Sequence, residues 1–446
     1  MVEKQATEYI GRYQILRKLG RGGMGFVYKA LAPVIDKVVA VKVLQPFEAM
    51  EALLGYERLK EIFTFEAVTM AGLHHPALVD VWDYDEDSRG RPFFVMEYFC
   101  NNLGRMIGED FKLLKKSRPV RADKVLAYGQ QLLQGLGYLH DNDIVHRDIK
   151  PFNILITDDD RVKICDFGMA LVRNVSFSPS GSMQIGSPFY AAPEQNRHPD
   201  KVDGRADLYS AGVLLYRLLT GELPSMRSFS LSRVNPLYDA AWDEFFARAL
   251  SLLPDGRFQT AREMLAALNR LHVNLRGMCV LQTEEAPSAD RDGAPVPLRS
   301  APQNVCGEKA RLLFGLNEQF RPQINGRKKF VDEPGGVSRD PATGLIWRKG
   351  GSEYRLCWQD AQGYIDGLNA RRDAGRENWR LPTVNELFSL LCDELRACRP
   401  DVNLAGLWFW SCDRHGARDA WYVNLDMEFA DWQDVSCRNF VRAVCG

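Results

Sequence analysis

The sequence contains no long hydrophobic run and carries almost no net charge. Its most apolar helix-like stretch, residues 208–219, includes Tyr209, Ser210 and Arg217 and is too short to cross a bilayer. The first 16 residues lack the apolar core of a signal peptide. A formal net charge of -1 gives no electrostatic reason to expect nucleic acid or an anionic membrane as a partner. We therefore expect a soluble, intracellular protein without a membrane span.

Cysteine pairs with zinc-ligand spacing are also missing. The chain has ten cysteines, seven of them between Cys306 and Cys445, but none forms a CxxC pair. A structural metal site is therefore not expected. The length of 446 residues and the hydrophobic content of 46% are those of a globular chain with room for two or three domains.

Three short strings occur in a fixed order along the first half of the chain: His146-Arg147-Asp148, Asp166-Phe167-Gly168 and Ala192-Pro193-Glu194. A glycine-rich run and a Val-Ala-Val-Lys strand precede them. Any one string could arise by chance, but the ordered set hardly could. The sequence resembles the bacterial eukaryotic-like (Hanks-type) Ser/Thr protein kinases over roughly its first 270 residues.

The resemblance implies an α+β fold class, with a bilobal protein kinase domain over residues 10–272. It implies an enzyme that uses ATP and Mg²⁺ to phosphorylate Ser or Thr of a protein substrate, with a cytoplasmic location. Lys150, two residues after Asp148, is typical of Ser/Thr rather than Tyr kinases. No catalytic position is degraded, so a pseudokinase is not expected.

The glycine-rich run, residues 19–30, has the pattern strand, tight turn, strand. Gly20, Gly22 and Gly25 remove Cβ atoms where the backbone approaches phosphate oxygens, and they permit positive φ in the turn. The same glycine spacing also marks dinucleotide-binding folds, in which a helix follows. Here residues 26–30 are rich in β-formers and another strand follows, so the dinucleotide interpretation is excluded.

The next strand, residues 37–44, carries Lys42. Alternation along the strand puts Lys42 on the same face as Ala40, a small residue suited to lie against adenine. By resemblance, Lys42 binds the α- and β-phosphates and pairs with a glutamate on the following helix. Glu66 is the preferred partner because the residues after it have the family's spacing, and Glu61 is the alternative. The segment from Lys42 to Glu66 is somewhat longer than is usual.

The catalytic loop is the most specific motif. Asp148 is placed to accept or orient the proton of the attacking hydroxyl, and Lys150 neutralises charge on the γ-phosphate. Asn153 and Asp166 supply oxygen ligands to Mg²⁺, a cation that prefers oxygen. The predicted catalytic residues are Asp148, Lys150 and Lys42, and the predicted metal ligands are Asn153 and Asp166.

By the same resemblance, the nucleotide site draws on both lobes. Met96 is the gatekeeper, the main chain of Glu97 and Phe99 pairs with adenine, and Leu155 forms the floor beneath it. The predicted set for ATP and its metal is Leu19, Gly20, Gly22, Gly25, Val27, Ala40, Lys42, Glu66, Glu97, Phe99, Asn153, Leu155 and Asp166.

The activation segment runs over residues 169–186 and is rich in serine. Arg147 directly precedes the catalytic Asp148, as in kinases whose segment is ordered by a phosphate paired with arginine. We expect autophosphorylation between Ser176 and Ser182, and the alternative is a serine-rich loop that is never modified. Two structural roles are also implied: Glu194 and Arg257 form an ion pair under the substrate loop, and Asp207 holds the backbone of the catalytic loop.

The remainder of the chain has a different composition. Residues 273–326 are interpreted as a linker, of which 309–325 could belong to either side, and tryptophans concentrate after about residue 330. We expect a helix at residues 358–369 and another that begins at a Thr383–Glu386 capping box. Two strings carry a second resemblance: Asp340-Pro341-Ala342-Thr343-Gly344-Leu345-Ile346-Trp347 and Asn378-Trp379-Arg380-Leu381-Pro382-Thr383-Val384-Asn385-Glu386-Leu387.

These strings resemble formylglycine-generating-enzyme-like, C-type-lectin-like domains. The resemblance implies a smaller α+β domain over residues 327–446 that binds an unknown ligand or protein. The cysteine pair of the oxidases has no counterpart, so catalysis there is not expected. Trp408 or Trp432 could line a ligand surface. Four carboxylates, at residues 426, 428, 431 and 434, could suggest calcium, but a solvated acidic loop is the favoured interpretation.

Three questions stay open at this stage. Cytosolic cysteines are usually reduced, so thiols are favoured over disulfides. The chain could also be a ligand-binding protein whose kinase fold is a catalytically weak scaffold. Finally, the C-terminal surface could be a diversified binding module.

Overall fold

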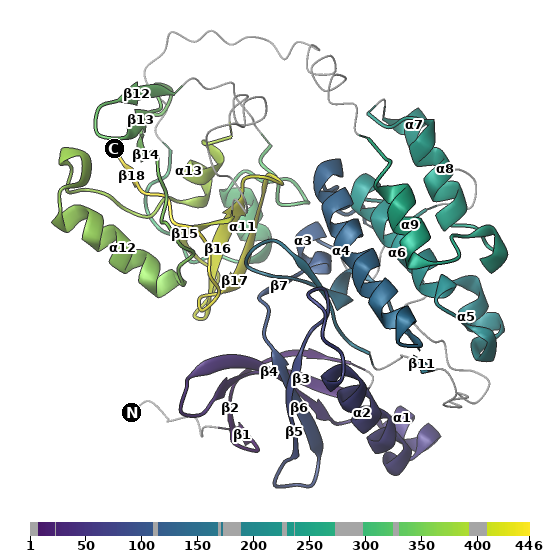
Figure 1. Cartoon of the computed structure of the whole chain (residues 1–446). Helices are drawn as coiled ribbons and strands as arrows, with labels where there is room; N and C mark the ends of the chain where they lie inside the picture. The colour runs from purple at the N-terminus through teal and green to yellow at the C-terminus, as the bar shows by residue number, and fades with distance from the viewer. Residues whose placement is uncertain are drawn as a thin grey trace. The chain divides into compact units, whose positions relative to one another are not determined.

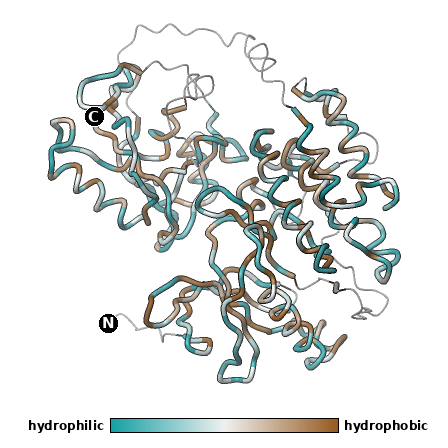
Figure 2. The backbone as a smooth tube through the Cα atoms, in the orientation of Figure 1, coloured by the Kyte–Doolittle hydropathy of each residue, from teal (hydrophilic) through white to brown (hydrophobic). Residues whose placement is uncertain are grey.

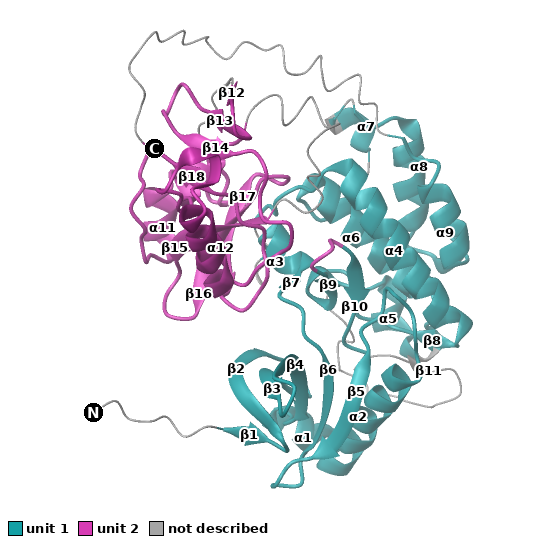
Figure 3. Ribbon diagram, turned by 60° about the vertical axis from the view of Figure 1, so that its left-hand side comes forward, with its two compact units in different colours: residues 1–157, 161–281 teal, residues 158–160, 282–446 magenta. Residues whose placement is uncertain are grey.

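The computed structural model describes residues 8–22, 24–109, 115–167, 171–172, 189–224, 230–235, 237–272, 298–323, 330–391 and 408–446. The chain divides into two compact units, residues 1–157 with 161–281 and residues 158–160 with 282–446 (Figure 3). Within the described residues, no helix is long and apolar enough to cross a membrane.

The first unit begins with a six-stranded antiparallel sheet in the order β1-β2-β3-β4-β6-β5 (Figure 1). Its strands are β1 (Tyr9–Ile10), β2 (Tyr13–Arg21), β3 (Gly25–Ala32), β4 (Lys37–Leu44), β5 (Val81–Glu86) and β6 (Pro92–Glu97). Valines at alternate positions of β4 lie on one face of the strand. They pack with residues of β3 and β6 in a buried apolar cluster. The opposite face of β4 carries Ala40 and Lys42.

Two helices follow β4: α1 (Glu48–Leu54) and α2 (Tyr56–Ala71). Gly55 separates them with φ of +76°, a backbone conformation that favours glycine. The helix α1 accounts for the extra length between Lys42 and Glu66 noted in the sequence. Phe63 of α2 packs against Phe94 of β6 with ring centroids 5.1 Å apart, so α2 lies on the Lys42 side of the sheet.

The rest of the first unit is mainly helical. Its helices are α3 (Leu103–Ile107), α4 (Ala122–Asp141), α5 (Pro193–Arg197), α6 (Arg205–Thr220), α7 (Leu231–Val234), α8 (Ala240–Ala249) and α9 (Ala261–Leu268), with 3-10 turns at Pro151–Asn153, Pro199–Lys201 and Pro254–Gly256. The helix α6 is buried on nearly all sides, which is typical of a helix at the centre of a lobe. The helices α4 and α6 contact each other, and both contain many hydrophobic residues, drawn in brown in Figure 2.

Two small sheets frame the catalytic loop. One has the order β10-β9-β7, from Val162–Ile164, Ile154–Ile156 and Asn101–Asn102. The other pairs β11 (Leu171–Val172) with β8 (Ile144–Val145). Between β8 and β9 the chain carries the His-Arg-Asp string, so its position is fixed by strands on both sides. The strands, the α2 helix and the helical lobe together form a mixed α and β architecture.

The second unit has two antiparallel sheets and three helices among its described residues. One sheet is β12-β13-β14-β18, from Val331–Glu333, Val337–Arg339, Ile346–Arg348 and Val444–Cys445. The other is β15-β16-β17, from Trp408–Arg414, Asp419–Asn424 and Phe429–Asp434. The helices are α11 (Gly307–Leu313), α12 (Trp358–Ala370) and α13 (Val384–Phe388), and a 3-10 turn lies at Asp373–Gly375. The predicted helix at residues 358–369 and the Thr383–Glu386 capping box are confirmed.

The predicted linker, residues 273–326, includes residues that belong to the second unit. Residues 298–323 belong to the fold of the second unit, because Ala310, Phe314 and Leu316 lie in its main hydrophobic core. The indole nitrogen of Trp421 donates to the carbonyl of Val305 at 3.0 Å. A polypeptide that began at residue 327 would therefore lack part of the core.

Two other expectations for this unit need correction. Trp408 lies in β15, is only 4% exposed and stacks on Tyr422, so it does not line a surface. Asp431 and Asp434 lie within β17 rather than in an acidic loop. Among the described residues no group of three or more metal-ligating side chains converges.

Five cysteines within the described residues carry free thiols: Cys165, Cys306, Cys357, Cys412 and Cys445. The expectation of reduced cysteines therefore holds for these five.

Candidate active site

Three charged side chains meet between the sheet and the catalytic loop. The Lys42 Nζ atom lies 2.6 Å from Glu66 Oε1 and 2.9 Å from Asp166 Oδ1. Glu66 is buried on α2, whereas the side chain of Glu61 is 64% exposed and pairs with Arg58. The geometry therefore selects Glu66 over Glu61 as the partner of Lys42.

The protonation states of this cluster follow from its charges. Burial alone would lower the pKa of Lys42, but the carboxylates of Asp166 and Glu66 outweigh it and hold that pKa above the ordinary value. The ammonium of Lys42 lowers the pKa of Asp166 to about 2, against the opposing effect of burial. At neutral pH, Lys42 is therefore a cation and Asp166 an anion, as a site for phosphate and metal requires.

The catalytic loop holds Asp148 between two donors. Lys150 Nζ donates to Asp148 Oδ2 at 2.6 Å, and Asn153 Nδ2 donates to the same oxygen at 3.0 Å. Asn153 Nδ2 also donates to the main-chain carbonyl of Asp148 at 2.8 Å. Because the amide nitrogen of Asn153 faces Asp148, its carbonyl oxygen is the atom directed to other partners. The three residues thus form one oriented group with both charge signs.

Asp207 of α6 binds the backbone of the catalytic loop. Its two carboxylate oxygens accept from the backbone amides of His146, at 2.9 Å, and Arg147, at 2.8 Å. His140 Nε2 lies 2.9 Å from the same carboxylate. Burial would raise the pKa of Asp207, but these partners, His140 first, hold it below its ordinary value. Nothing in the sequence motifs pointed to His140, which lies outside the recognised strings.

The backbone is strained at two points of this site. Arg147 and Asp166 both have φ of +67°, in the left-handed region that non-glycine residues rarely adopt. Such conformations cost of order 1–3 kcal/mol each and persist where surrounding contacts impose them. Here the contacts are the hydrogen bond from the Arg147 amide to Asp207 and the bond from Lys42 to Asp166. The bond from Lys42 holds the Asp166 carboxylate in the cluster.

Phe167 is buried, and its ring lies 5.1 Å from that of His146. The ion pair between Glu194 and Arg257 is bidentate, with contacts of 2.6 and 2.7 Å, and Arg257 is completely buried. The contact of Phe167 with His146 lies before the activation segment, and the ion pair of Glu194 with Arg257 lies after it.

The glycine-rich turn uses its glycines in two different ways. A Cβ at Gly25 would lie 1.9 Å from the carbonyl oxygen of Val43, so this glycine is required by close packing of β3 on β4. A Cβ at Gly20 would meet no atom within 4 Å, and one at Gly22 would only touch Gly25. None of the three has positive φ, so the conformational freedom that glycine permits is not used at these positions.

Strand register places the remaining residues of the predicted nucleotide set. Val27 pairs with Lys42 across β3 and β4, and Ala40 pairs with Met96 across β4 and β6. Leu19 lies near the end of β2, and Glu97 ends β6, two residues before Phe99. Leu155 lies in β9 and pairs with Lys163.

These residues fit a nucleotide and a divalent cation. Asp166 and Asn153 offer oxygen atoms, which Mg²⁺ prefers, and Lys42 offers a cation for phosphate. The open space above Gly20 and Gly22 lets a phosphate approach the backbone. The side chain of Asp166 is 43% exposed despite its ion pair, so it can still reach a ligand.

The predicted phosphorylation window, Ser176 to Ser182, lies outside the described residues. The same holds for Gly168 of the second string and for Gly23 of the glycine-rich turn. The short strand β11 is described, and its antiparallel pairing with β8 ties the start of the activation segment to the catalytic loop.

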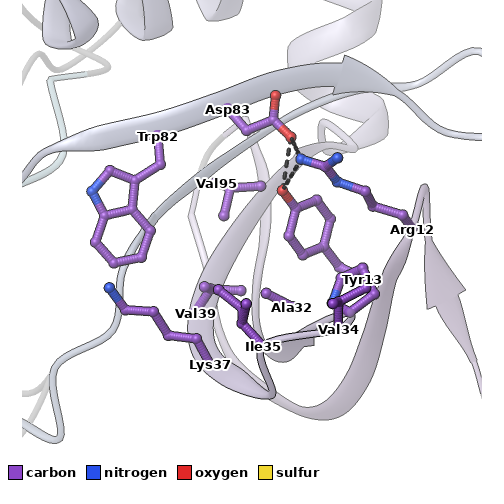
Figure 4. Close-up of a pocket in the computed structure, with 11 residues that line it drawn as sticks. Arg12, Tyr13, Ala32, Val34, Ile35, Lys37, Val39, Trp82, Asp83 and Val95 are labelled. Atoms are coloured by element: carbon purple, nitrogen blue, oxygen red, sulfur yellow. Dashed lines mark hydrogen bonds and ion pairs between the residues drawn. The ribbon is translucent and has the colours of Figure 1, made fainter.

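A separate cavity of about 310 Å³ lies on the other face of the sheet (Figure 4). Val39 and Val95 form its floor, and Lys37 lies over the ring of Trp82 at 4.0 Å. Asp83 accepts hydrogen bonds from Arg12 at 2.9 Å and from Tyr13 at 2.7 Å on the opposite wall. None of the predicted nucleotide residues lines this cavity.

Comparison with known proteins now identifies the family. Residues 13–252 match the protein kinase domain, and residues 336–445 match the Lcl C-terminal domain. The kinase match covers more than half of the chain, so this chain belongs to the protein kinase family. The second match lies within the second unit.

The curated relatives are bacterial kinases. One is the serine/threonine-protein kinase PknL of Mycobacterium tuberculosis, 35% identical over 353 residues, which are 75% of this chain and 81% of PknL. Another is a probable serine/threonine-protein kinase of Clostridium acetobutylicum, 31% identical over 67% of this chain and 45% of the relative. The chain thus spans less than half the length of several relatives that it matches.

Among solved structures, the PknI kinase domain of M. tuberculosis is 28% identical with a TM-score of 0.44. The match covers 59% of this chain and 98% of that one.

Proposed function

We propose that this chain is a Mg²⁺- and ATP-dependent protein serine/threonine kinase that autophosphorylates. The observation that carries the proposal is the convergence of Lys42, Glu66 and Asp166 beside the Asp148–Lys150–Asn153 group. The intact ion pairs of Lys42 with Glu66 and Asp166, and of Lys150 with Asp148, argue against a catalytically weak scaffold. The serine/threonine names of the relatives and Lys150 support the choice of acceptor.

The chemistry assigned to the chain's own residues is simple. The oxygen of a Ser or Thr hydroxyl forms a bond to the γ-phosphorus of ATP, and the bond between that phosphorus and the leaving ADP breaks. Asp148 accepts or orients the proton of this hydroxyl. Lys150 and Lys42 stabilise the negative charge on the transferred group and on the leaving phosphates. Mg²⁺, held by Asn153 and Asp166, would neutralise phosphate charge. Glu66 keeps Lys42 in place.

The proposed kinase domain spans residues 10–272, and a cytoplasmic location follows from its need for ATP. We assign the second unit, of which residues 298–323 are part, to binding a ligand or a partner protein. Its two sheets and buried tryptophans are compatible with a lectin-like α+β domain, and that class remains part of the proposal. A diversified binding surface is the alternative for the same unit.

Intact mass spectrometry after incubation with Mg-ATP tests the enzyme proposal. The full chain, a chain ending near Glu285 and the Asp148→Asn variant would be compared. Added phosphate in the first two, and none in the variant, is the expected result. Incorporation only in the shorter chain would mean that the second unit inhibits. No incorporation in either active chain would contradict the proposal and revive the weak-scaffold alternative.

A further inference from the structure

Arg21 lies in the glycine-rich turn, between Gly20 and Gly22, and its side chain stacks on two aromatic rings. Its guanidinium carbon lies 3.7 Å from the ring centroid of Phe47 and 4.7 Å from that of Phe26. Both distances are within the range of about 6 Å for a cation–π attraction. Arg21 forms no ion pair with an acidic side chain among the described residues. The two rings are therefore the contacts that hold this guanidinium in place.

The first ring, Phe26, belongs to the sheet. Phe26 is the second residue of β3, where it pairs with Arg21 of β2 and with Val43 of β4. Because paired residues lie on the same face of a sheet, Phe26 and Arg21 lie on the face opposite Lys42. Phe26 is only 8% exposed, so its ring is a fixed surface for the cation.

The second ring, Phe47, directly precedes α1, a helix that the hydrophobic core does not hold in place. No residue of α1 is buried. Two residues before Phe47, the amide of Gln45 donates to the carbonyl of Met24 at 2.9 Å. The glycine-rich turn is thus attached to the start of α1 by one backbone hydrogen bond and by the stacked side chain of Arg21.

This attachment joins two parts of the candidate active site. On one side is the turn, in which the Gly22 amide donates to the carbonyl of Gly25 at 2.8 Å. A Cβ on Gly20 would meet no atom within 4 Å, so the turn leaves space for a ligand. On the other side, α1 leads into α2, the helix that carries Glu66. The stacked guanidinium therefore connects the turn to the helices beside it.

We propose that Arg21 and Phe47 are positioning residues for the nucleotide. Their contact holds the turn in the conformation that leaves Gly20 and Gly22 open to phosphate, so that binding does not have to order it. Without the contact, the turn would occupy this conformation only part of the time, and the apparent affinity for the nucleotide would fall in proportion. Neither Arg21 nor Phe47 belongs to the predicted nucleotide set. This inference rests on the proposed kinase function.

The test measures the dissociation constant of the full-length protein for a fluorescent N-methylanthraniloyl derivative of ATP in the presence of Mg²⁺. Phe47→Leu keeps the apolar character and the net charge but removes one aromatic face. An exposed cation–π contact corresponds to a factor of about two to five in an equilibrium constant, so we expect the dissociation constant to rise about threefold. Phe47→Tyr keeps the aromatic face and should bind as the unmodified protein does. An unchanged constant in Phe47→Leu, or an equal rise in Phe47→Tyr, would overturn the inference.

Lys37→Gln is the matched control for the charge of Arg21. Lys37 lies over the ring of Trp82 at 4.0 Å, at the opposite end of β3 and β4 from the turn. Arg21→Gln removes the same charge and both contacts of the turn, so its dissociation constant should rise about fivefold, whereas that of Lys37→Gln should stay within about 1.5-fold. An equal rise in the two variants would be a general effect of charge and would overturn the inference.

Hydrogen exchange in the absence of nucleotide separates this inference from the proposed function. If the unmodified protein does not bind the ATP derivative, the kinase proposal fails, yet the peptides that contain the amides of Gly22 and Gln45 can still be followed by mass spectrometry. These amides should exchange about threefold faster in Phe47→Leu than in the unmodified protein or in Phe47→Tyr. Equal exchange in all three proteins would show that the contact does not hold the turn.

Discussion

Both units bury charged residues, but they arrange them differently. In the first unit, Lys42 is shared between Glu66 and Asp166, and the Asp166 carboxylate stays partly open to solvent. In the second unit, Arg299 meets Asp413 through two contacts of 2.8 Å, a closed pair whose acid is completely buried. That carboxylate also accepts backbone amides, so it has no capacity left for a ligand.

The second unit repeats this closed arrangement. Arg380 donates to both oxygens of Glu386, at 2.8 and 2.6 Å, and Glu386 also completes the capping box of α13. A buried ion pair is therefore not by itself a sign of a functional site. What distinguishes the first unit is a cation shared by two acids, one of them accessible, beside strained backbone.

The largest expected effect is at the open site. Asp148→Asn removes the group that takes or orients the hydroxyl proton, so phosphate incorporation should fall about a thousandfold. The melting temperature should change little, because the amide can still accept from Lys150 and Asn153. Intact mass after incubation with Mg-ATP measures the first and calorimetry the second. Retained incorporation would show that Asp148 is not part of the chemistry.

Removing the cation of a closed ion pair should lower the stability of the fold. Arg299→Met leaves the buried carboxylate of Asp413 without its cation, which should destabilise the second unit by about 3 kcal/mol. Chemical unfolding of the full chain, followed by tryptophan fluorescence because most tryptophans lie in this unit, measures the change. Arg414→Met, on the strand that carries Asp413, is the control. Equal unfolding midpoints for the two variants would contradict the structural role of the pair.

A smaller effect is expected from the partner of Lys42. Glu66→Gln weakens the pair and lets Lys42 move from the phosphates, so kcat/KM for ATP should fall roughly 10- to 100-fold. Glu61→Gln, on the same helix but exposed, should stay within about twofold. The comparison by steady-state kinetics discriminates between the two glutamates. Equal losses in both variants would mean that Glu66 has no special role.

The smallest effect concerns pH. The pKa of Asp166 is lowered in the folded state, from 3.8 to about 2, so the stabilisation it gains is present above about pH 4 and is lost as pH falls toward 2. The difference in free energy of unfolding between the protein and Asp166→Asn should be flat from about pH 5 to about pH 9. It should shrink only in acid. A loss that begins near neutral pH would contradict the charge assignment.

The elements with local signals could be predicted from the sequence. The helix α12 and the α13 cap follow from apolar spacing and from the Thr383–Glu386 box. Residues 298–323 could not be assigned, because their few apolar side chains have no regular period. Phe314 finds its partner, Trp421, more than a hundred residues later in the chain. Packing over that distance leaves no mark on local sequence.

In the candidate site, too, some residues could be predicted from local motifs and others only from the tertiary fold. Motif spacing was enough to single out Lys42 and Asp148, and Glu66 could be preferred over Glu61 before any geometry was known. His140 lies outside every motif, and only the tertiary fold brings it to its partner, Asp207. The packing role of Gly25 could not be predicted, because a glycine required by close packing looks the same in sequence as one that permits positive φ.

Gly25 has a consequence for how such motifs change during evolution. Its missing side chain serves the contact between two strands, whereas Gly20 and Gly22 leave room for a ligand. A descendant of this chain that abandoned phosphate transfer would be free to replace Gly20 and Gly22 but would have to retain Gly25. A degenerate motif with only its last glycine left would then indicate a retired enzyme that still folds.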